Sequence, residues 1–173
     1  MDEEKRNERI AWLVYWDETV QDSYAYGSTV SFAWDGSVTF ENEGMPPGFV
    51  IREWHSYSDY RMRQTAPQLP MLEEGKCYCL RIVKQDDPER GSFVRINYYD
   101  RRGDLLSFQM LKEKEGVLTY PREAFRYTLQ LVQGGARTVY FTRMEIVPEE
   151  YWENWNAARI PEREEGRTRT CRW

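Results

Sequence analysis

The fold is decided by residues 92–111, which read SFVRINYYDRRGDLLSFQML. In the first half, Val94, Ile96 and Tyr98 form one apolar row, and the alternate positions are mixed. Because successive side chains of a strand point to opposite faces, this period of two predicts a strand with one buried face. An Arg-Gly-Asp turn signal follows at 102–104, and a second apolar segment comes after it. The stretch therefore predicts two strands joined by a tight turn.

The same period of two extends outward along most of the chain. Turn signals rich in Gly, Pro and Asp separate the alternating segments, and no interior segment has a convincing helical period. Many short strands joined by tight turns are typical of a β-sandwich or a jelly roll. The predicted fold class is therefore all-β, with strands at residues 10–16, 29–33, 37–41, 49–55, 76–84, 92–100, 105–111, 116–120, 125–133 and 138–147.

The last part of the chain changes character. Residues 149–158 are expected to form a short helix, in which Trp152 and Trp155 would share a face because they are three apart. This appendage would either pack back onto the sandwich or dock on a partner. We accordingly divide the chain into a charged N-terminal lead (1–9), a β-sandwich domain (10–147) and a short helical or irregular C-terminal appendage (148–173).

Charge and hydropathy exclude several classes of function. The formal net charge is -5 and the isoelectric point is near 5.1, whereas phosphate-backbone binding needs a basic face. We therefore expect no nucleic-acid partner. The lead is charged and no apolar run follows it, so no signal peptide is indicated. No stretch approaches the roughly 20 apolar residues of a membrane span. We expect a cytoplasmic protein.

The sequence shows no motif for catalysis or metal binding. It contains 3 cysteines and 1 histidine. Cys77 and Cys79 are two apart in a predicted strand and are expected to be reduced thiols, while His55 lacks partners for a zinc site. A phosphate-binding glycine loop, a nucleophile elbow and a paired-histidine helix are all missing. We expect no enzyme, cofactor or metal, although a carboxylate pair stays open among 29 acidic residues.

One predicted sheet face carries polar side chains that suit sugar hydroxyls. If strands 76–84, 92–100 and 125–133 share a sheet, alternation places their mixed rows on its outer side. Guanidinium and amide groups can form paired hydrogen bonds beside an aromatic ring that covers the apolar sugar face. A solvated face or a protein interface is the alternative. The carbohydrate-binding candidates are Arg81, Arg95, Asn97, Tyr99, Arg126 and Gln130, with Thr128 beside them.

Two loops, at 43–48 and 56–74, are longer than the tight turns. A long loop inside a compact domain is either functional or a crossing between the two sheets, and both readings stay open. The second loop gathers Tyr, Arg and Met, which are frequent in interfaces. The partner-interface candidates are Trp54, which could instead anchor the loop internally, Tyr57, Tyr60, Arg61 and Arg63, with Met62 among them.

Residues 93–147 resemble the second half of a jelly-roll carbohydrate-binding module. FVRINYYDRRGDLL is similar to its strand–turn–strand unit, and GVLTYPREAFRYTLQLVQGGARTVYFTRMEIV is similar to its proline turn, long strand and final strand. Many such modules carry Asp in the final strand, where this chain has Thr142. The resemblance therefore implies the sandwich fold without a calcium site at that position.

A second resemblance is more specific and covers roughly residues 10–147. It is carried by Met45-Pro46-Pro47-Gly48, Asp59-Tyr60-Arg61, Leu69-Pro70-Met71-Leu72 and Thr119-Tyr120-Pro121, among other positions. These resemble the smallest of the three Asp-named accessory Sec proteins of Gram-positive bacteria, which act in the export of serine-rich-repeat glycoprotein adhesins. The tail after Val147 is not part of that pattern.

This second resemblance implies a cytosolic, non-enzymatic subunit of the export machinery. Its implied partners are the two larger accessory Sec proteins, the accessory motor ATPase and the glycosylated serine-rich-repeat adhesin. Its implied task is to scaffold the larger proteins and to help present the adhesin to the motor. A free-standing carbohydrate-binding module is the alternative, and a glycan-modifying enzyme is the third class.

Overall fold

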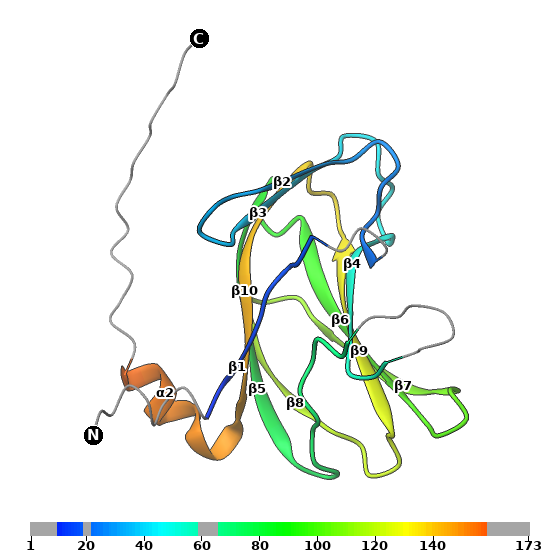
Figure 1. The fold of residues 1–173 in the computed structure, drawn as a ribbon, viewed down its shortest axis with the longest axis vertical. Helices are drawn as coiled ribbons and strands as arrows, with labels where there is room; N and C mark the ends of the chain where they lie inside the picture. The colour runs from blue at the N-terminus through cyan, green and yellow to red at the C-terminus, as the bar shows by residue number, and fades with distance from the viewer. Residues whose placement is uncertain (1–9, 19–21, 59–65, 159–173) are drawn as a thin grey trace.

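The computed structural model describes residues 10–18, 22–58 and 66–158. Within them the chain forms ten strands, each of which overlaps one of the predicted segments. The predicted all-β fold class is confirmed, because two antiparallel sheets face each other across a common core (Figure 1). The strands are β1 (Trp12–Val14), β2 (Thr29–Phe32), β3 (Val38–Glu41), β4 (Val50–His55), β5 (Cys77–Asp87), β6 (Ser92–Tyr99), β7 (Leu105–Leu111), β8 (Glu115–Thr119), β9 (Arg126–Gln133) and β10 (Thr138–Pro148).

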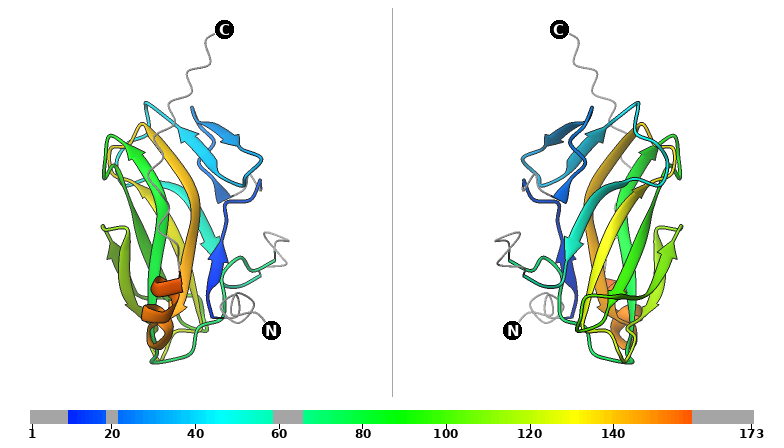
Figure 2. Two further views of the ribbon diagram at one scale, coloured as in Figure 1. Left: turned by 90° about the vertical axis from the view of Figure 1, so that its left-hand side faces the viewer. Right: turned by 90° about the vertical axis from the view of Figure 1, so that its right-hand side faces the viewer.

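The two sheets divide the described strands unevenly. Sheet A contains six of them, in the order β2-β3-β10-β5-β8 with β1 paired to β10. Sheet B contains four, in the order β4-β9-β6-β7. Consecutive strands such as β5 and β6 therefore belong to different sheets, and the chain crosses the sandwich repeatedly, as jelly rolls do. Figure 2 shows the two layers from both sides.

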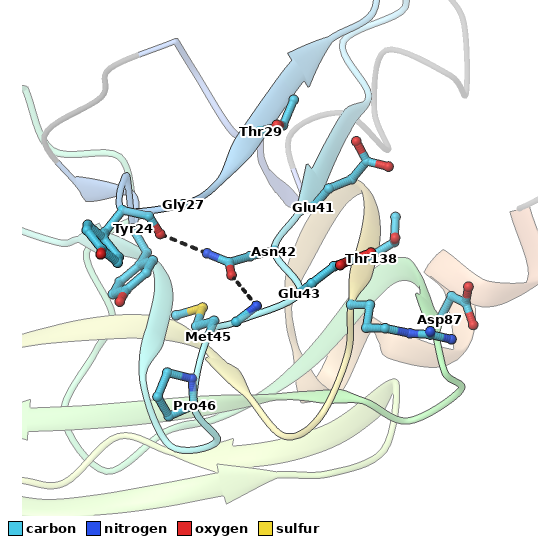
Figure 3. A pocket seen from close by; sticks show the side chains of 13 residues that line it. Tyr24, Gly27, Thr29, Glu41, Asn42, Glu43, Met45, Pro46, Asp87 and Thr138 are labelled. Atoms are coloured by element: carbon cyan, nitrogen blue, oxygen red, sulfur yellow. Dashed lines mark hydrogen bonds between the residues drawn. The ribbon is translucent and has the colours of Figure 1, made fainter.

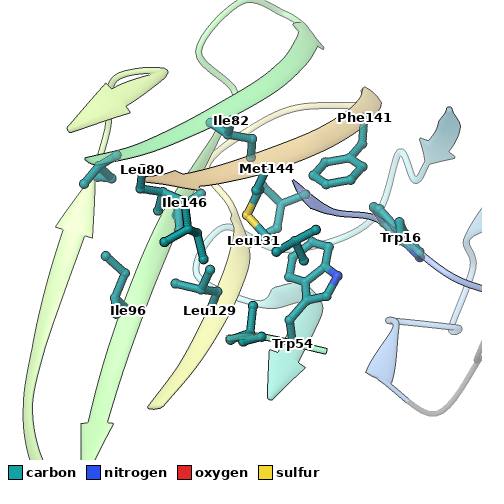
Figure 4. Packing of buried hydrophobic residues seen from close by; sticks show 14 of the residues in the cluster. Trp16, Trp54, Leu80, Ile82, Ile96, Leu129, Leu131, Phe141, Met144 and Ile146 are labelled. Atoms are coloured by element: carbon teal, nitrogen blue, oxygen red, sulfur yellow. The ribbon is translucent and has the colours of Figure 1, made fainter. Parts of the chain in front are cut away.

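The core between the sheets is centred on three aromatic rings (Figure 4). Trp54 of β4 and Phe141 of β10 stack with their ring centroids 5.4 Å apart. Trp16, which follows β1, meets both rings at steep angles of 83° and 71°. Edge-to-face and offset contacts of this kind add to the free energy gained by burying the rings. The core thus joins the N-terminal segment to both sheets.

The apolar rows predicted from alternation line this core. Val94 and Ile96 of β6 are 1% and 0% exposed, and Leu129 and Leu131 of β9 are 0% exposed. Leu80 of β5 meets them from sheet A and is also fully buried. Strict alternation places the remaining side chains of β6 and β9 on the outer face of sheet B and those of β5 on the outer face of sheet A.

The predicted C-terminal helix is confirmed. A 3-10 turn, η2 (Glu149–Tyr151), leads into α2 (Trp152–Ala158), which lies beside β10 and β5 in Figure 1. The indole of Trp152 stacks on the Arg81 guanidinium, 4.6 Å from the ring centroid. Arg81 also donates to the side chain of Asn156. These contacts hold α2 against the outer face of sheet A.

Candidate functional site

The outer face of sheet B collects most of the sugar-binding candidates. In the register of β6 and β9, Arg95 lies opposite Gln130, Asn97 opposite Thr128, and Tyr99 opposite Arg126. Directly opposite residues of an antiparallel pair place their side chains on the same face. The structure therefore brings five of the six candidates together, and their binding of sugar stays a prediction.

Arg81 does not belong to this group, and that prediction is wrong. Its strand, β5, pairs with β10 and β8 in sheet A rather than with β6 or β9. There its guanidinium contacts Glu115 at 2.6 Å and Glu145 at 3.5 Å, in addition to Trp152. Glu145 is fully buried and also accepts hydrogen bonds from Arg143 Nε (2.9 Å) and Trp155 Nε1 (3.1 Å). Arg81 therefore anchors the helix.

The guanidinium groups of the two arginines on the sheet B face lie over aromatic rings. The Arg95 guanidinium is 4.4 Å from the ring centroid of Phe108 on β7. The Arg126 guanidinium is 4.3 Å from the ring of Tyr57 and 5.9 Å from the ring of Tyr99. Stacking of this kind fixes a guanidinium in place while its in-plane N–H groups stay able to donate. The face thus presents two oriented positive charges.

Several polar atoms of this face have no hydrogen-bond partner in the described part of the chain. They are the Nε atoms of Arg95 and Arg126 and the Oδ1 atom of Asn97. Asn97 is 3% exposed, and its Nδ2 donates to Thr128 Oγ1 at 3.3 Å. No ion pair among the described residues involves either arginine. A buried polar group without a partner is costly, and because these three atoms have almost no accessible surface, an external ligand would reach them only if the surrounding side chains moved.

Sequence reasoning missed the contribution of β7 to this surface. Phe108 lies opposite Asn97, and Met110 lies opposite Arg95. They are 51% and 49% exposed, and Leu105 at the start of the strand is 49% exposed. The signal was present, since residues 105–111 (LLSFQML) contain no charged side chain. Without the strand order, however, an apolar run of this length indicates a buried strand as readily as an exposed one.

The proposed partner loop is described only in part. Trp54 is 0% exposed and its Nε1 donates to the carbonyl oxygen of Tyr15 at 2.9 Å, so its prediction as a partner contact is wrong. It is a core anchor, as the alternative reading had it. Tyr57 is half-buried, with its ring beneath Arg126 and 5.6 Å from the ring of His55. The remaining candidates, Tyr60, Arg61 and Arg63, lie outside the described residues.

A polar hollow of about 810 Å³ lies at one end of the sandwich (Figure 3). Asn42 organises its wall: Nδ2 donates to the Tyr26 carbonyl oxygen (2.9 Å) and to Ser28 Oγ (2.8 Å), and Oδ1 accepts from the Gly44 N–H (2.9 Å). Separate loops and strand ends contribute the lining, which is why no sequence pattern predicted it. Its acidic residues do not form a metal-binding cluster within the described ranges. The sheet B face is the better candidate site.

Two other reactive side chains of the described residues, those of Cys79 and His55, are buried. Cys79 is 5% exposed, and burial raises the pKa of its thiol to about 11. A thiol with so high a pKa carries little thiolate near neutral pH and is a poor nucleophile. His55 is also buried, with its Nε2 atom 3.3 Å from Asp22 Oδ1.

The helices found within the described residues are too short or too polar to cross a lipid bilayer.

Comparison with known proteins identifies one family. Residues 23–148 match the family described as accessory Sec secretory system ASP3. Accessory Sec system proteins of that name from Staphylococcus aureus and Streptococcus gordonii are each 32% identical to this chain, over 133 and 148 residues. The matches cover 77% and 79% of this chain. The chain spans 41% of the length of the first relative and 93% of the second.

Solved structures also include relatives from the accessory secretory system. A chain in the crystal structure of accessory secretory proteins 1, 2 and 3 from Streptococcus pneumoniae is 33% identical and superposes with a TM-score of 0.74, over 78% of this chain and 94% of that one. Carbohydrate-binding modules are also among the similar folds, including a xylan-binding domain with 12% identity and a TM-score of 0.42. No conclusion about sugar follows from the second likeness.

Proposed function

We propose a function for this chain from one premise: the chain belongs to the accessory Sec secretory system ASP3 family. It serves as a non-catalytic subunit that holds two larger accessory proteins together in the cytosol. It also helps to present a glycosylated serine-rich-repeat adhesin to the accessory export motor. The observation that carries the proposal is the match to a relative solved together with accessory secretory proteins 1 and 2.

The outer face of sheet B is the surface we assign to the glycosylated substrate. Arg95 and Arg126 hold their guanidinium groups over aromatic rings, and Gln130 supplies an amide directly opposite Arg95 in the register. Sugar hydroxyls accept and donate hydrogen bonds, so they match the guanidinium groups of Arg95 and Arg126 and the amide of Gln130. The half-exposed ring of Phe108 offers an apolar surface to the sugar ring.

The test compares two double variants that remove equal charge. Arg95→Ala with Arg126→Ala removes both guanidinium groups of the face, while Lys76→Ala with Arg122→Ala removes two exposed positive charges elsewhere. We expect the first variant to bind a purified glycosylated serine-rich repeat at least about tenfold more weakly, and the second to bind like the parent. Calorimetry with glycosylated and unglycosylated repeat measures the difference.

Two results would count against this assignment. Unchanged affinity in the Arg95 and Arg126 variant, with an unchanged melting temperature, would remove the sheet B face from substrate binding. Tight binding of the glycosylated repeat by a chain that forms no complex with the larger accessory proteins would favour a free-standing carbohydrate-binding module instead.

A further inference from the structure

Strand β7 is an uncovered edge of sheet B. Within the described residues it pairs only with β6, so one side of its backbone has no strand beside it. Figure 2 shows β7, in light green, on the side of the molecule away from the blue N-terminal strands. Free edges invite pairing with another chain, and natural proteins protect them with charge, proline, bulges or covering segments. Residues 105–111 carry neither charge nor proline.

Four apolar side chains of β7 are exposed, and three of them lie on the outer face of sheet B. Leu105, Phe108 and Met110 are each about half exposed, and Leu106 is 38% exposed. The register explains Leu106: Tyr98 pairs with Ser107 and Tyr99 with Leu105, so Leu106 is the extra residue of a bulge. Several neighbouring apolar side chains at this exposure form a patch of the kind that marks an interaction site.

Two other sheet edges show how this protein protects an edge elsewhere. On β4, the Tyr24 N–H donates to the Ile51 carbonyl oxygen at 2.8 Å, and Ser23 forms a bridge with Arg52. On β8, the Val117 carbonyl oxygen accepts from the side chain of Gln109 at 2.7 Å. Neither kind of cover is found on the free side of β7 in the described ranges, although the bulge at Leu106 interrupts one end of this edge. The difference points to a cover supplied from outside.

The surroundings of β7 are basic, although the whole chain has a net charge of -5. Five positive side chains lie on or next to the strand: Arg95 beneath Phe108, Arg101 and Arg102 in the preceding turn, and Lys112 and Lys114 just after it. Asp100, Asp104 and Glu113 oppose them in the same segments, so the basic side chains are in excess by two. A partner that matches this surface would be apolar in its centre and acidic at its margins.

We infer that β7 receives an extended strand from one of the two larger accessory proteins, with apolar residues facing Phe108 and Met110 and carboxylates near the flanking basic residues. This inference rests on the proposed function, because the partner is a subunit of the same complex. Strand addition would give affinity through backbone hydrogen bonds and specificity through alternate side chains. The added strand would extend sheet B and widen the face assigned to the glycan.

The direct test is amide hydrogen exchange on the chain alone and on its co-purified complex with both larger proteins. About half of the backbone N–H groups of an edge strand point away from its neighbour, so about half of those in 105–111 should exchange rapidly in the free chain. In the complex we expect those amides to become protected, with little change in β8. A complex that forms while β7 exchanges as before overturns the inference and leaves the proposed function standing.

Two further outcomes are equally decisive. Failure to form any complex with the larger proteins overturns both the inference and the proposed function. Protection of 105–111 that appears in the chain alone as its concentration rises, and does not increase with the partners, overturns the inference in favour of pairing between two copies of this chain.

A pair of matched variants tests the side-chain part of the inference. Phe108→Lys with Met110→Lys places charges on the exposed face of β7, whereas Val117→Lys with Thr119→Lys does the same on β8 of sheet A. We expect the first pair to weaken assembly with the larger proteins at least about tenfold and the second to leave it unchanged. Equal effects of the two pairs, with both variants folded, overturn the assignment to β7.

Discussion

The outer faces of the two sheets use arginine in opposite ways. On sheet A, Arg81 and Arg143 surround a fully buried carboxylate, Glu145, and α2 closes over them. On sheet B, Arg95 and Arg126 rest on aromatic rings, and no described carboxylate pairs with them. On sheet A the arginines are therefore paired with a carboxylate of the same chain, whereas on sheet B their guanidinium groups have no acidic partner among the described residues. Residue type alone therefore does not mark a binding face.

The largest effect is expected from the buried carboxylate of sheet A. Replacing Glu145 with Ala removes the buried carboxylate that Arg81 and Arg143 contact, so that Arg81 keeps only Glu115 as an acidic partner in the described residues, and it removes the acceptor of the Trp155 indole. We expect a loss of about 3 kcal/mol in the free energy of unfolding, measured by denaturant titration. Glu53→Ala, on the sheet B side, is the matched control and should cost about 1 kcal/mol or less. Equal losses of unfolding free energy in Glu145→Ala and Glu53→Ala would show that the carboxylate on sheet A is no more important for stability than the one on sheet B.

The second prediction compares Arg81 and Arg95, which we expect to have opposite relative effects on stability and on binding of the glycosylated repeat. Arg81→Ala should lower stability by about 2 kcal/mol, because it removes two charged contacts and the stacking of Trp152. Arg95→Ala should cost about 1 kcal/mol or less, since it loses only the contact with Phe108. Binding of the glycosylated repeat should respond in the reverse order. If Arg81→Ala weakened that binding while leaving stability intact, our assignment of Arg81 to the helix anchor would be wrong.

The third prediction concerns how firmly the C-terminal helix covers sheet A. Cys79 should react with iodoacetamide far more slowly than the half-buried Cys77 at pH 8, because burial raises the pKa of Cys79 to about 11. Peptide mapping by mass spectrometry separates the two sites. Trp155→Ala, which removes the indole bond to Glu145, should speed labelling of Cys79 selectively. A Cys79 rate that does not change would mean that the helix does not protect it.

The smallest effect is expected at the turn between β6 and β7. Asp100 Oδ1 accepts from the backbone N–H groups of Asp104 (2.9 Å), Arg102 (2.8 Å) and Gly103 (2.9 Å), and these bonds lower the pKa of the carboxyl. A lowered folded-state pKa contributes stability above the unfolded-state value and loses it as the pH falls through the folded-state value. The stability gap between the parent and Asp100→Ala should therefore narrow below about pH 4. A gap that is independent of pH would exclude this role.

The strands could be predicted because one row of alternate side chains in β6 and β9 is mainly apolar. In both strands this row faces the core, and the other row mixes polar residues with Phe93 and Val132 and faces outward. Val94 and Leu131 could therefore be assigned to the core face from the sequence. The same pattern does not state which sheet a strand joins. Arg81 was therefore grouped with Arg95 and Asn97, although β5 lies in the other sheet.

Two further residues show where sequence reasoning stops. Trp54 lies in a strand whose register shifts between Val50 and Arg52, and Arg52, beside the core tryptophans, is itself fully buried. Alternation there gives no clean inner row, so the sequence left open whether Trp54 is an internal anchor or a partner contact. The exposure of Phe108 depends on β7 being the last strand of its sheet. Strand order arises from contacts between distant segments, which no local pattern encodes.

The account rests on sheet B being the open face and sheet A the closed one, and side-chain footprinting tests this most directly. Hydroxyl radicals would be applied to the free chain and to the complex with both larger accessory proteins and the glycosylated repeat. We predict strong protection of Phe108, Met110 and Tyr99 on sheet B, and unchanged oxidation of Tyr140 and Trp152 on sheet A. Protection confined to Tyr140 and Trp152, with Phe108 and Met110 still fully reactive, would contradict the account.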